Sequence, residues 1–477
     1  MPKKKLGPMN LYPLLPKTNC GECGPKTCMG FAVQLTERNL GIDQCPPIAD
    51  PKYQVQLSRI RELLAPPVRE VVIGTGPRKV RVGGELVMRR HELRYFNQTA
   101  IATLVSDDML PDQVQAKVKE TEAFRYPYIG STLTLDAIAV RSVTGDPASF
   151  RNTVKTVREA TELPLILWSF DPRVIAAGLE AAAGHRPLIY AANVENWQEM
   201  AGLARDAGCP LALFVPDDIR TIRSLAASVR AAGVEDLLLD VGCGFSESLP
   251  STINDLTEIR TAAVNEGDSL LGYPIIGSPA TLWEKRNSES DETIRWMESC
   301  LASMMVIRYV DLLMVRDASM WSILPLVVLR ANLFNDPRKP VSVEPGLRTF
   351  GNPDPDRSPV LITSNFALTY YTVLADIEKL DCYLMVADTE GLSVDSAVAG
   401  RKLNAQKVAD IILSTGIEGL ARHRTLIIPG LAARLKGDIE DATGWDVMVG
   451  PRDSAGIPAF LKEKWEGKDH TPGWSYR

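Results

Sequence analysis

The feature that most constrains the fold of this chain is a repeated pattern between residues 98 and 332. Short apolar runs recur there, and amphipathic stretches of helical periodicity lie between them. A short apolar run bounded by turn residues is typical of a strand buried on both faces, and its alternation with helices indicates a parallel sheet. The predicted strands are Ile101–Val105, Leu133–Val140, Leu165–Trp168, Leu188–Ala191, Leu211–Val215, Leu237–Val241, Tyr273–Ile276 and Leu312–Val315.

Eight such strands, each with its helix, match a closed (β/α)8 TIM barrel in number and in length. An open, doubly wound sheet is the alternative. Several predicted helices begin at an aspartate or serine that can cap the first turn. These helices are Asp112–Phe124, Asp171–Ala183, Asp217–Ala232 and Asp291–Met305.

A second α/β pattern follows a segment rich in proline, aspartate and glycine at residues 333–358, which we interpret as a linker or lid. It predicts a small doubly wound (Rossmann-like) domain, and such domains bind ligands beyond the carboxyl ends of their strands. The predicted strands are Val360–Thr363, Cys382–Ala387, Thr425–Ile428 and Trp445–Val449, and the predicted helices are Ala367–Leu380, Arg401–Ser414, Leu431–Ala442 and Ile457–Glu466. The candidate ligand loops are Thr363–Thr372, Thr389–Val394, Pro429–Leu431 and Gly450–Ser454.

Four of the eight cysteines gather near the N-terminus with the spacing C-x2-C-x4-C-x16-C, at Cys20, Cys23, Cys28 and Cys45. Thiolates crowded into one short loop favour a [4Fe–4S] cluster, because one chain must reach several corners of a cube. A structural zinc site is the alternative, although zinc sites usually show two C-x2-C pairs. We expect a helix at Met29–Leu40, between the third and fourth ligands.

Together these patterns predict an α/β chain of four parts. They are a [4Fe–4S] cluster domain at residues 1–60, a β-hairpin linker at 61–97, a TIM barrel at 98–332 and an α/β domain at 333–477. The net charge of −6 argues against nucleic-acid binding. No apolar run is long enough to span a membrane and no signal-peptide pattern opens the chain, so we expect a cytoplasmic protein.

The chain resembles a known family, the large subunit of the corrinoid iron–sulfur protein, which in archaea is the gamma subunit of the acetyl-CoA decarbonylase/synthase complex. The stretch Leu14–Gly24, which reads LLPKTNCGECG, is close to the opening of that family. The stretch Ser364–Thr372, which reads SNFALTYYT, is similar to its corrinoid-binding segment. The resemblance extends over essentially the whole chain.

The resemblance implies a methyl carrier of one-carbon metabolism, with methyltransferase activity as part of a complex. A cobalt corrinoid (cobamide) in the C-terminal domain would accept a methyl group, as cob(I)amide, from a methyl-tetrahydropterin. It would pass that group to the nickel centre of acetyl-CoA synthase, reversibly, and the [4Fe–4S] cluster would re-reduce Co(II). The implied partners are a delta subunit in a heterodimer, the acetyl-CoA synthase and CO dehydrogenase subunits, and the pterin or its methyltransferase.

The resemblance also implies where the ligands bind. The implied corrinoid contacts are Asn365, Leu368, Thr369, Tyr370, Tyr371, Thr372, Gly430 and Leu431, with Thr369 or Thr372 near the cobalt. Related barrels bind methyl-pterins with aspartate and asparagine at their strand ends, which makes Asn193 and Asp240 the pterin candidates. None of the four histidines stands in the D-x-H-x-x-G motif that supplies an axial ligand to cobalt in many cobalamin proteins.

Two other functions fit the same sequence. The chain could be a pure electron-transfer protein, in which the cluster serves an outside partner and the barrel is a scaffold. It could also be a self-contained pterin methyltransferase whose cluster is regulatory. Iron without cobalt would favour the first function, and pterin binding by the barrel would favour the second.

Overall fold

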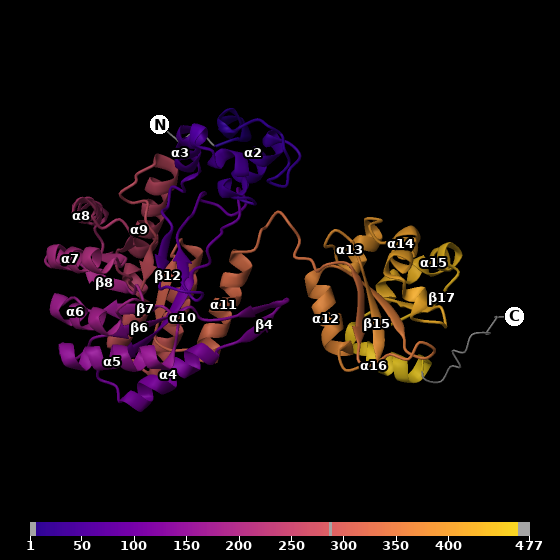
Figure 1. Ribbon diagram of the computed structural model, residues 1–477. Helices are drawn as coiled ribbons and strands as arrows, with labels where there is room; N and C mark the ends of the chain where they lie inside the picture. The colour runs from indigo at the N-terminus through magenta and orange to yellow at the C-terminus, as the bar shows by residue number, and fades with distance from the viewer. Residues whose placement is uncertain (1–5, 286–288, 466–477) are drawn as a thin grey trace. The chain divides into compact units, whose positions relative to one another are not determined.

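The structure is a computed structural model, and it describes residues 6–285 and 289–465. The chain divides into two compact units (Figure 1). One unit holds the cysteine module and the barrel, and the other holds the C-terminal α/β domain together with residues 127–132. None of the helices in the two described ranges combines the length and the apolar character needed to cross a bilayer.

The cysteine module is built from short helices and turns around its own apolar core, in which Leu11, Phe31 and Ile60 are fully buried. Helix α2 begins at Cys28 and is capped by Thr27, whose hydroxyl accepts the N–H of Gly30 at 3.1 Å. The prediction of a helix here is confirmed, although it ends four residues earlier than expected. The helices are α1 (Pro8–Leu11), α2 (Cys28–Thr36) and α3 (Gln54–Leu64).

The barrel is the predicted parallel eight-stranded sheet, in the order β10-β9-β8-β7-β6-β3-β12-β11. A bridge between Leu239 and Ile275 joins the two ends of this order, so the sheet closes on itself. The prediction of a closed barrel is therefore confirmed, and the open sheet is excluded. The strands are β3 (Ala100–Ser106), β6 (Ala137–Arg141), β7 (Leu165–Trp168), β8 (Leu188–Ala192), β9 (Leu211–Phe214), β10 (Leu237–Asp240), β11 (Ile276–Gly277) and β12 (Leu312–Val315).

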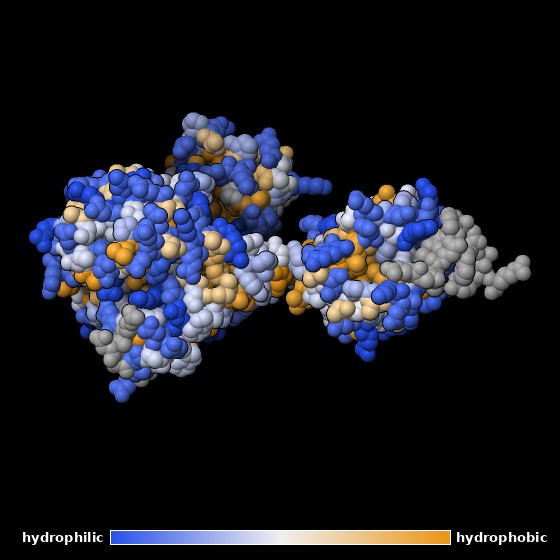
Figure 2. Space-filling model, turned by 90° about the horizontal axis from the view of Figure 1, so that it is seen from below, coloured by the Kyte–Doolittle hydropathy of each residue, from blue (hydrophilic) through white to orange (hydrophobic). Residues whose placement is uncertain are grey.

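Helices cover the outside of this sheet, and the face seen in Figure 2 is mostly hydrophilic with scattered apolar residues. The helices are α4 (Pro111–Ala123), α5 (Pro147–Ala160), α6 (Pro172–Ala181), α7 (Trp197–Ala207), α8 (Ile219–Ala231), α9 (Leu249–Thr261), α10 (Asp291–Ile307) and α11 (Met320–Leu333). Of the predicted caps, Asp171 accepts the backbone N–H of Arg173 as expected. Helices α8 and α10 are capped by the neighbours of the predicted residues, Asp218 and Ser290, and the predicted cap of α4 is wrong because Leu110 stands at its N-cap position.

Two hairpins lie outside the eight-stranded sheet. Strands β1 (Val71–Ile73) and β2 (Val80–Val82) pair antiparallel, and their buried side chains join the core inside the barrel. The N–H of Gly74 donates to the carbonyl of Arg186, just before β8, so this hairpin closes the amino end of the barrel rather than acting as a linker. The predicted strand 133–140 is wrong at its start, because Leu133 ends the second hairpin, β4 (Tyr126–Tyr128) and β5 (Ser131–Leu133).

The C-terminal domain contains a five-stranded sheet in the order β13-β15-β14-β16-β17. Four strands are parallel, as predicted, but β13 runs antiparallel along β15. The segment 333–358 is thus not only a linker or lid. Its Leu347 packs against the core of the domain. The edge strand was not predicted because a short stretch rich in glycine and proline shows too little strand periodicity. The strands are β13 (Gly346–Phe350), β14 (Val360–Ser364), β15 (Cys382–Ala387), β16 (Thr425–Ile428) and β17 (Asp446–Val449).

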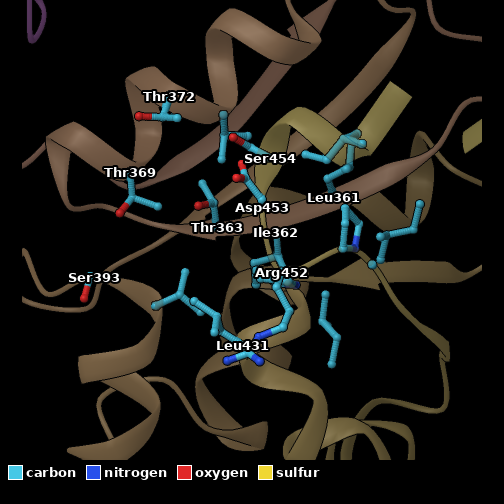
Figure 3. A pocket seen from close by; sticks show the side chains of 18 of the residues that line it. Leu361, Ile362, Thr363, Thr369, Thr372, Ser393, Leu431, Arg452, Asp453 and Ser454 are labelled. Atoms are coloured by element: carbon cyan, nitrogen blue, oxygen red, sulfur yellow. The ribbon is translucent and has the colours of Figure 1, made fainter. Parts of the chain in front are cut away.

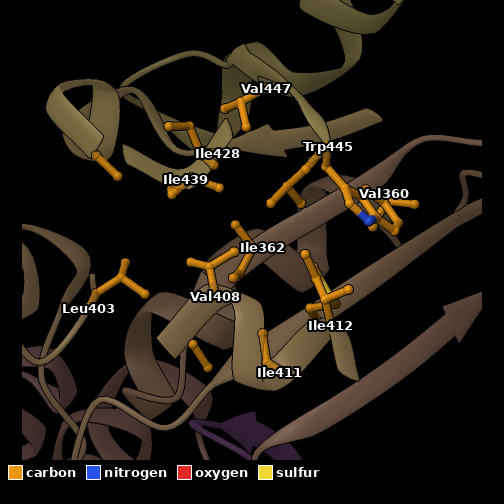
Figure 4. Packing of buried hydrophobic residues seen from close by; sticks show 14 of the residues in the cluster. Val360, Ile362, Leu403, Val408, Ile411, Ile412, Ile428, Ile439, Trp445 and Val447 are labelled. Atoms are coloured by element: carbon orange, nitrogen blue, oxygen red, sulfur yellow. The ribbon is translucent and has the colours of Figure 1, made fainter. Parts of the chain in front are cut away.

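Alternate residues of these strands point to the two sides of the sheet, as period-two geometry requires. One side packs Val360, Ile362 and Val447 around the buried ring of Trp445 (Figure 4). The opposite side packs Leu361, Leu384 and Ile427 under the helices that follow β14 and β17. The helices are α12 (Ala367–Ile377), α13 (Val394–Ala399), α14 (Ala405–Thr415), α15 (Lys436–Thr443) and α16 (Ile457–Phe460).

Candidate functional sites

The loop that carries the cysteines is shaped by left-handed backbone. Gly21 has φ of 78° and Gly24 has φ of 100°, and only glycine adopts these values without strain. The side-chain oxygen of Asn19 accepts the N–H of Cys28 at 2.8 Å, which folds the loop back onto the start of α2. Cys28 and Cys45 are buried, and Cys20 is exposed.

The four thiols influence one another electrostatically. Burial raises the pKa of the Cys23 thiol, and the nearby Cys45, Cys20 and Cys28 raise it further. Burial also raises the pKa of Cys45, to which Cys28 and Cys20 add. Across residues 6–285 and 289–465, no three His, Cys, Asp or Glu side chains are already spaced around a single metal ion. The donor set is four thiols close enough to oppose each other's ionisation, three from the loop and start of α2 and the fourth after α2, and it fits a group that carries positive charge.

The carboxyl end of the barrel contains a cavity of about 400 Å³. The rings of Trp168, Phe170 and Phe214 form part of its wall, and Tyr190 and Asp240 lie deeper. An aromatic wall with one buried acid suits a flat heterocycle that carries hydrogen-bond donors. The remaining lining residues are Arg141, Pro216, Asp217, Gly242, Cys243, Gly244, Ser248, Ser278, Thr281 and Glu284.

Asp240, the last residue of β10, is fully buried. Its Oδ2 accepts the hydroxyls of Tyr190 at 2.8 Å and Ser278 at 3.0 Å, and its Oδ1 accepts the N–H of Gly242 at 2.7 Å. Burial raises the pKa of this carboxyl to about 6, although the three hydrogen bonds stabilise the anion. Asp240 is therefore a fully buried carboxyl of this cavity whose pKa lies above its ordinary value.

Asn193, the other pterin candidate, does not line this cavity. Its side-chain oxygen accepts the N–H groups of Glu195 at 2.9 Å and Asn196 at 3.0 Å, so it closes the turn after β8. The aromatic wall was not predicted, because Trp168 and Phe214 end apolar strands and look like core residues in sequence.

A second cavity of about 400 Å³ lies in the C-terminal domain, at the carboxyl ends of its parallel strands (Figure 3). Aliphatic side chains of the sheet line it, together with the hydroxyls of Thr363, Thr369 and Thr372. Residues from all four predicted ligand loops reach it. Its lining residues are Leu361, Ile362, Thr363, Leu368, Thr369, Thr372, Val373, Leu384, Ser393, Val394, Asp395, Ile427, Ile428, Pro429, Leu431, Gly450, Pro451, Arg452, Asp453, Ser454 and Ile457.

Of the residues that the resemblance implied as corrinoid contacts, four line this cavity: Leu368, Thr369, Thr372 and Leu431.

The other four do not line it. The ring of Tyr370 packs in the domain core, and Tyr371 is partly buried against it with the two ring centroids 5.0 Å apart. The side-chain oxygen of Asn365 accepts N–H groups of Thr389 and Gly391 and so joins two loops. A Cβ on Gly430 would lie 2.8 Å from the backbone nitrogen of Arg452, so this glycine permits two loops to pack closely.

Thr363 begins the predicted ligand loop Thr363–Thr372 and lines this cavity, although it was not among the implied corrinoid contacts. It is 1% exposed, and its hydroxyl has no hydrogen-bond partner in the described structure. A buried hydroxyl without a partner costs free energy, and a ligand that supplies one removes that cost. The apolar walls and this hydroxyl fit a large organic ring that carries amide groups.

His423 is the histidine of the C-terminal domain within the described residues, since His470 lies outside them. Its Nε2 is 2.9 Å from the carbonyl oxygen of Ser358, and its Nδ1 accepts the N–H of Thr425 at 3.1 Å. It precedes β16 and is not among the cavity residues, so it is held at the opposite end of that strand.

Two family models match this chain. A family model described as CO dehydrogenase/acetyl-CoA synthase delta subunit matches residues 70–461, and a model for an Fe–S cluster matches residues 15–47. In solved structures, dihydropteroate synthase from Thermus thermophilus has a TM-score of 0.39 and 16% identity, covering 56% of this chain and 97% of that one. Dihydropteroate synthase from Xanthomonas albilineans has a TM-score of 0.36 and 17% identity, covering 50% and 94%.

Several curated relatives match nearly end to end, and each is named acetyl-CoA decarbonylase/synthase complex subunit gamma. The protein of Methanopyrus kandleri is 43% identical over 96% of this chain and 98% of its own. Those of Methanothermobacter thermautotrophicus and Archaeoglobus fulgidus are both 41% identical, over 95% and 98% of this chain and 98% and 100% of their own. Because this similarity covers both units and the cysteine module, the chain belongs to the family of acetyl-CoA decarbonylase/synthase complex gamma subunits.

Proposed function

We propose that this chain is the methyl carrier of its complex, holding a corrinoid in the cavity of the C-terminal domain and a [4Fe–4S] cluster on Cys20, Cys23, Cys28 and Cys45. When bound, the corrinoid supplies a cobalt that takes a methyl group from a methyl-tetrahydropterin and gives it to the nickel centre of acetyl-CoA synthase, and the cluster supplies single electrons for reactivation.

The observation that carries this proposal is the cavity of about 400 Å³ whose lining includes Thr363, a residue with a buried hydroxyl that has no partner in the described structure. In the proposed complex, Thr363 binds an amide at the edge of the ring, and Thr369 and Thr372 present further hydroxyls. Leu361 and Ile427 exclude water from the covered face. No imidazole is among the described residues that line the cavity, so the protein offers alcohols and aliphatic groups there.

The cysteine module has the separate task of electron entry. Cys23, Cys28 and Cys45 are buried and would shield the cluster. Cys20 is exposed and would leave one corner near the surface, where a reductant can approach. The proposed partners are a delta subunit, the CO dehydrogenase and acetyl-CoA synthase subunits, and a methyl-tetrahydropterin or its methyltransferase.

A cavity-filling pair tests the corrinoid site. Thr369→Trp puts an indole into the cavity, whereas Ala375→Trp puts the same group on an exposed position of the same helix. The full chain, prepared anaerobically with its delta subunit and hydroxocobalamin, should retain cobalt in the wild type and in Ala375→Trp and lose it in Thr369→Trp. A wild-type complex that retains iron but no cobalt would favour the electron-transfer function instead.

The barrel mouth supports a second activity, the methyltransferase step on the pterin. The specific observation is the buried Asp240, held by Tyr190 and Ser278 beneath an aromatic wall. In this function the rings of Trp168 and Phe214 sandwich the heterocycle, and Asp240 orders or protonates its nitrogen edge. Asn193 would contribute only by shaping the loop.

Pterin titration of the full chain tests whether this barrel or a separate methyltransferase binds the pterin. Binding of a methyl-tetrahydropterin should weaken in Phe214→Ala and in Asp240→Asn and stay unchanged in Asn193→Ser. Binding that appears only after a separate methyltransferase is added would assign this step to that enzyme.

A further inference from the structure

Arg452 is the one cation among the described residues that line the C-terminal cavity. It lies three residues after the end of β17, at the carboxyl edge of the sheet. No carboxylate of the described residues forms an ion pair with it, in contrast to Arg422, which pairs with Asp356 at 3.2 Å. An unpaired guanidinium at the wall of a cavity has its donors available for a ligand.

Two acids, Asp395 and Asp453, also line the cavity. The Oδ1 of Asp453 accepts the N–H of Ala455 at 3.1 Å and caps the turn that leads into α16. Asp395 lies in the first turn of α13. In Figure 3 the side chain of Arg452 extends toward Leu431, while Asp453 lies beside Ser454. Neither carboxylate forms an ion pair with Arg452 in the described residues, so the guanidinium keeps its donors.

We infer that Arg452 binds the phosphodiester of the nucleotide loop of the corrinoid, which makes it a specificity-determining residue for complete cobamides. The inference rests on the proposed function, because it assigns one group of the ligand proposed there. The ring of a cobamide carries neutral amides, and its nucleotide loop carries the phosphodiester as its anionic group. A guanidinium binds phosphate oxygens with two parallel, charge-assisted hydrogen bonds.

The test compares two ligands and four proteins. Cobalamin carries the nucleotide loop, and cobinamide is the same corrin without loop and phosphate. Their dissociation constants are measured by absorbance change with the full chain and its delta subunit, at low and high salt. The variants are Arg452→Gln, Arg452→Lys and the matched control Arg424→Gln, an exposed arginine immediately before β16, at the other edge of the sheet.

The inference predicts that Arg452→Gln weakens cobalamin binding about tenfold, the usual range for one charge-assisted bond at a partly exposed site, and leaves cobinamide binding unchanged. Arg452→Lys should recover part of the loss, Arg424→Gln should lose nothing, and salt should weaken only cobalamin. An equal loss of both ligands, or no loss of either, overturns the role of Arg452 while the proposed function stands. If the wild type binds neither ligand, the proposed function itself fails, and the inference fails with it.

Discussion

The side-chain oxygen of Asn365 accepts both the backbone N–H of Thr389, at 3.0 Å, and its hydroxyl, at 2.9 Å. The same oxygen accepts the N–H of Gly391 at 3.0 Å, and the amide nitrogen of Asn365 donates to Asp388 at 3.2 Å. Asn365 thus joins the loop after β14 to the loop after β15, and it is not among the residues that line the cavity.

Asn365→Ala should destabilise the C-terminal domain by about 2 kcal/mol, because it leaves buried N–H and O–H groups without acceptors. Amide hydrogen exchange should show lost protection at residues 389–391. The control Asn404→Ala removes only the cap of α14, where Asn404 accepts the N–H of Lys407 at 2.9 Å, and should cost about 1 kcal/mol. Unchanged amide hydrogen exchange at residues 389–391 would contradict the conclusion that Asn365 joins the two loops.

Thr363→Val should separate ligand binding from folding. Valine has nearly the same shape as threonine, so the change removes only a hydroxyl that lacks a partner, and thermal stability should stay equal or rise. Corrinoid affinity should fall about threefold to tenfold, as for the loss of one neutral hydrogen bond. A variant that loses stability but keeps its affinity would show that the hydroxyl serves the fold.

Much of this architecture could be predicted from sequence because its signals are local. Buried parallel strands appear as continuous apolar runs, and β7, β12, β15 and β16 have the predicted bounds. The loops around the C-terminal cavity followed from the rule that ligands bind at the carboxyl ends of parallel strands.

What sequence could not supply was the direction in which individual side chains point. Asn365 and Thr363 belong to one short segment, yet one is fully hydrogen-bonded and the other has no partner. Gly430 was predicted as a ligand contact and instead permits close backbone packing against Arg452. Such roles depend on residues far apart in the chain, which local patterns do not encode.

Asp240→Asn should change how stability depends on pH. The pKa of this carboxyl is raised from 3.8 to about 6 in the folded barrel, so the folded state holds its proton more tightly than the unfolded state. The unfolding free energy of the wild type therefore falls as pH rises from about 4 to about 6 and levels off above that range. Denaturant titrations should show that the difference in unfolding free energy between wild type and Asp240→Asn changes between about pH 4 and pH 6 and is constant outside that range. A difference that is constant across it would contradict the raised pKa.

Cys23→Ser should remove the cluster and spare the corrinoid, because the two sites belong to separate compact units. The variant should retain cobalt and fail to recover from Co(II) under a low-potential donor. The matched control Cys300→Ser changes an exposed cysteine outside the module and should behave as wild type. Normal reactivation of Cys23→Ser would show that the electrons reach cobalt by another route.

The central claim is that one chain holds both an iron–sulfur cluster and a cobalt corrinoid. The most direct test is metal analysis of the anaerobically purified gamma–delta complex, together with its visible spectrum. The account predicts about four irons from a single cuboidal cluster, one corrinoid cobalt and corrin absorption bands for each gamma chain. Iron and sulfide without cobalt or corrin absorbance, in a complex given excess cobamide, would contradict it.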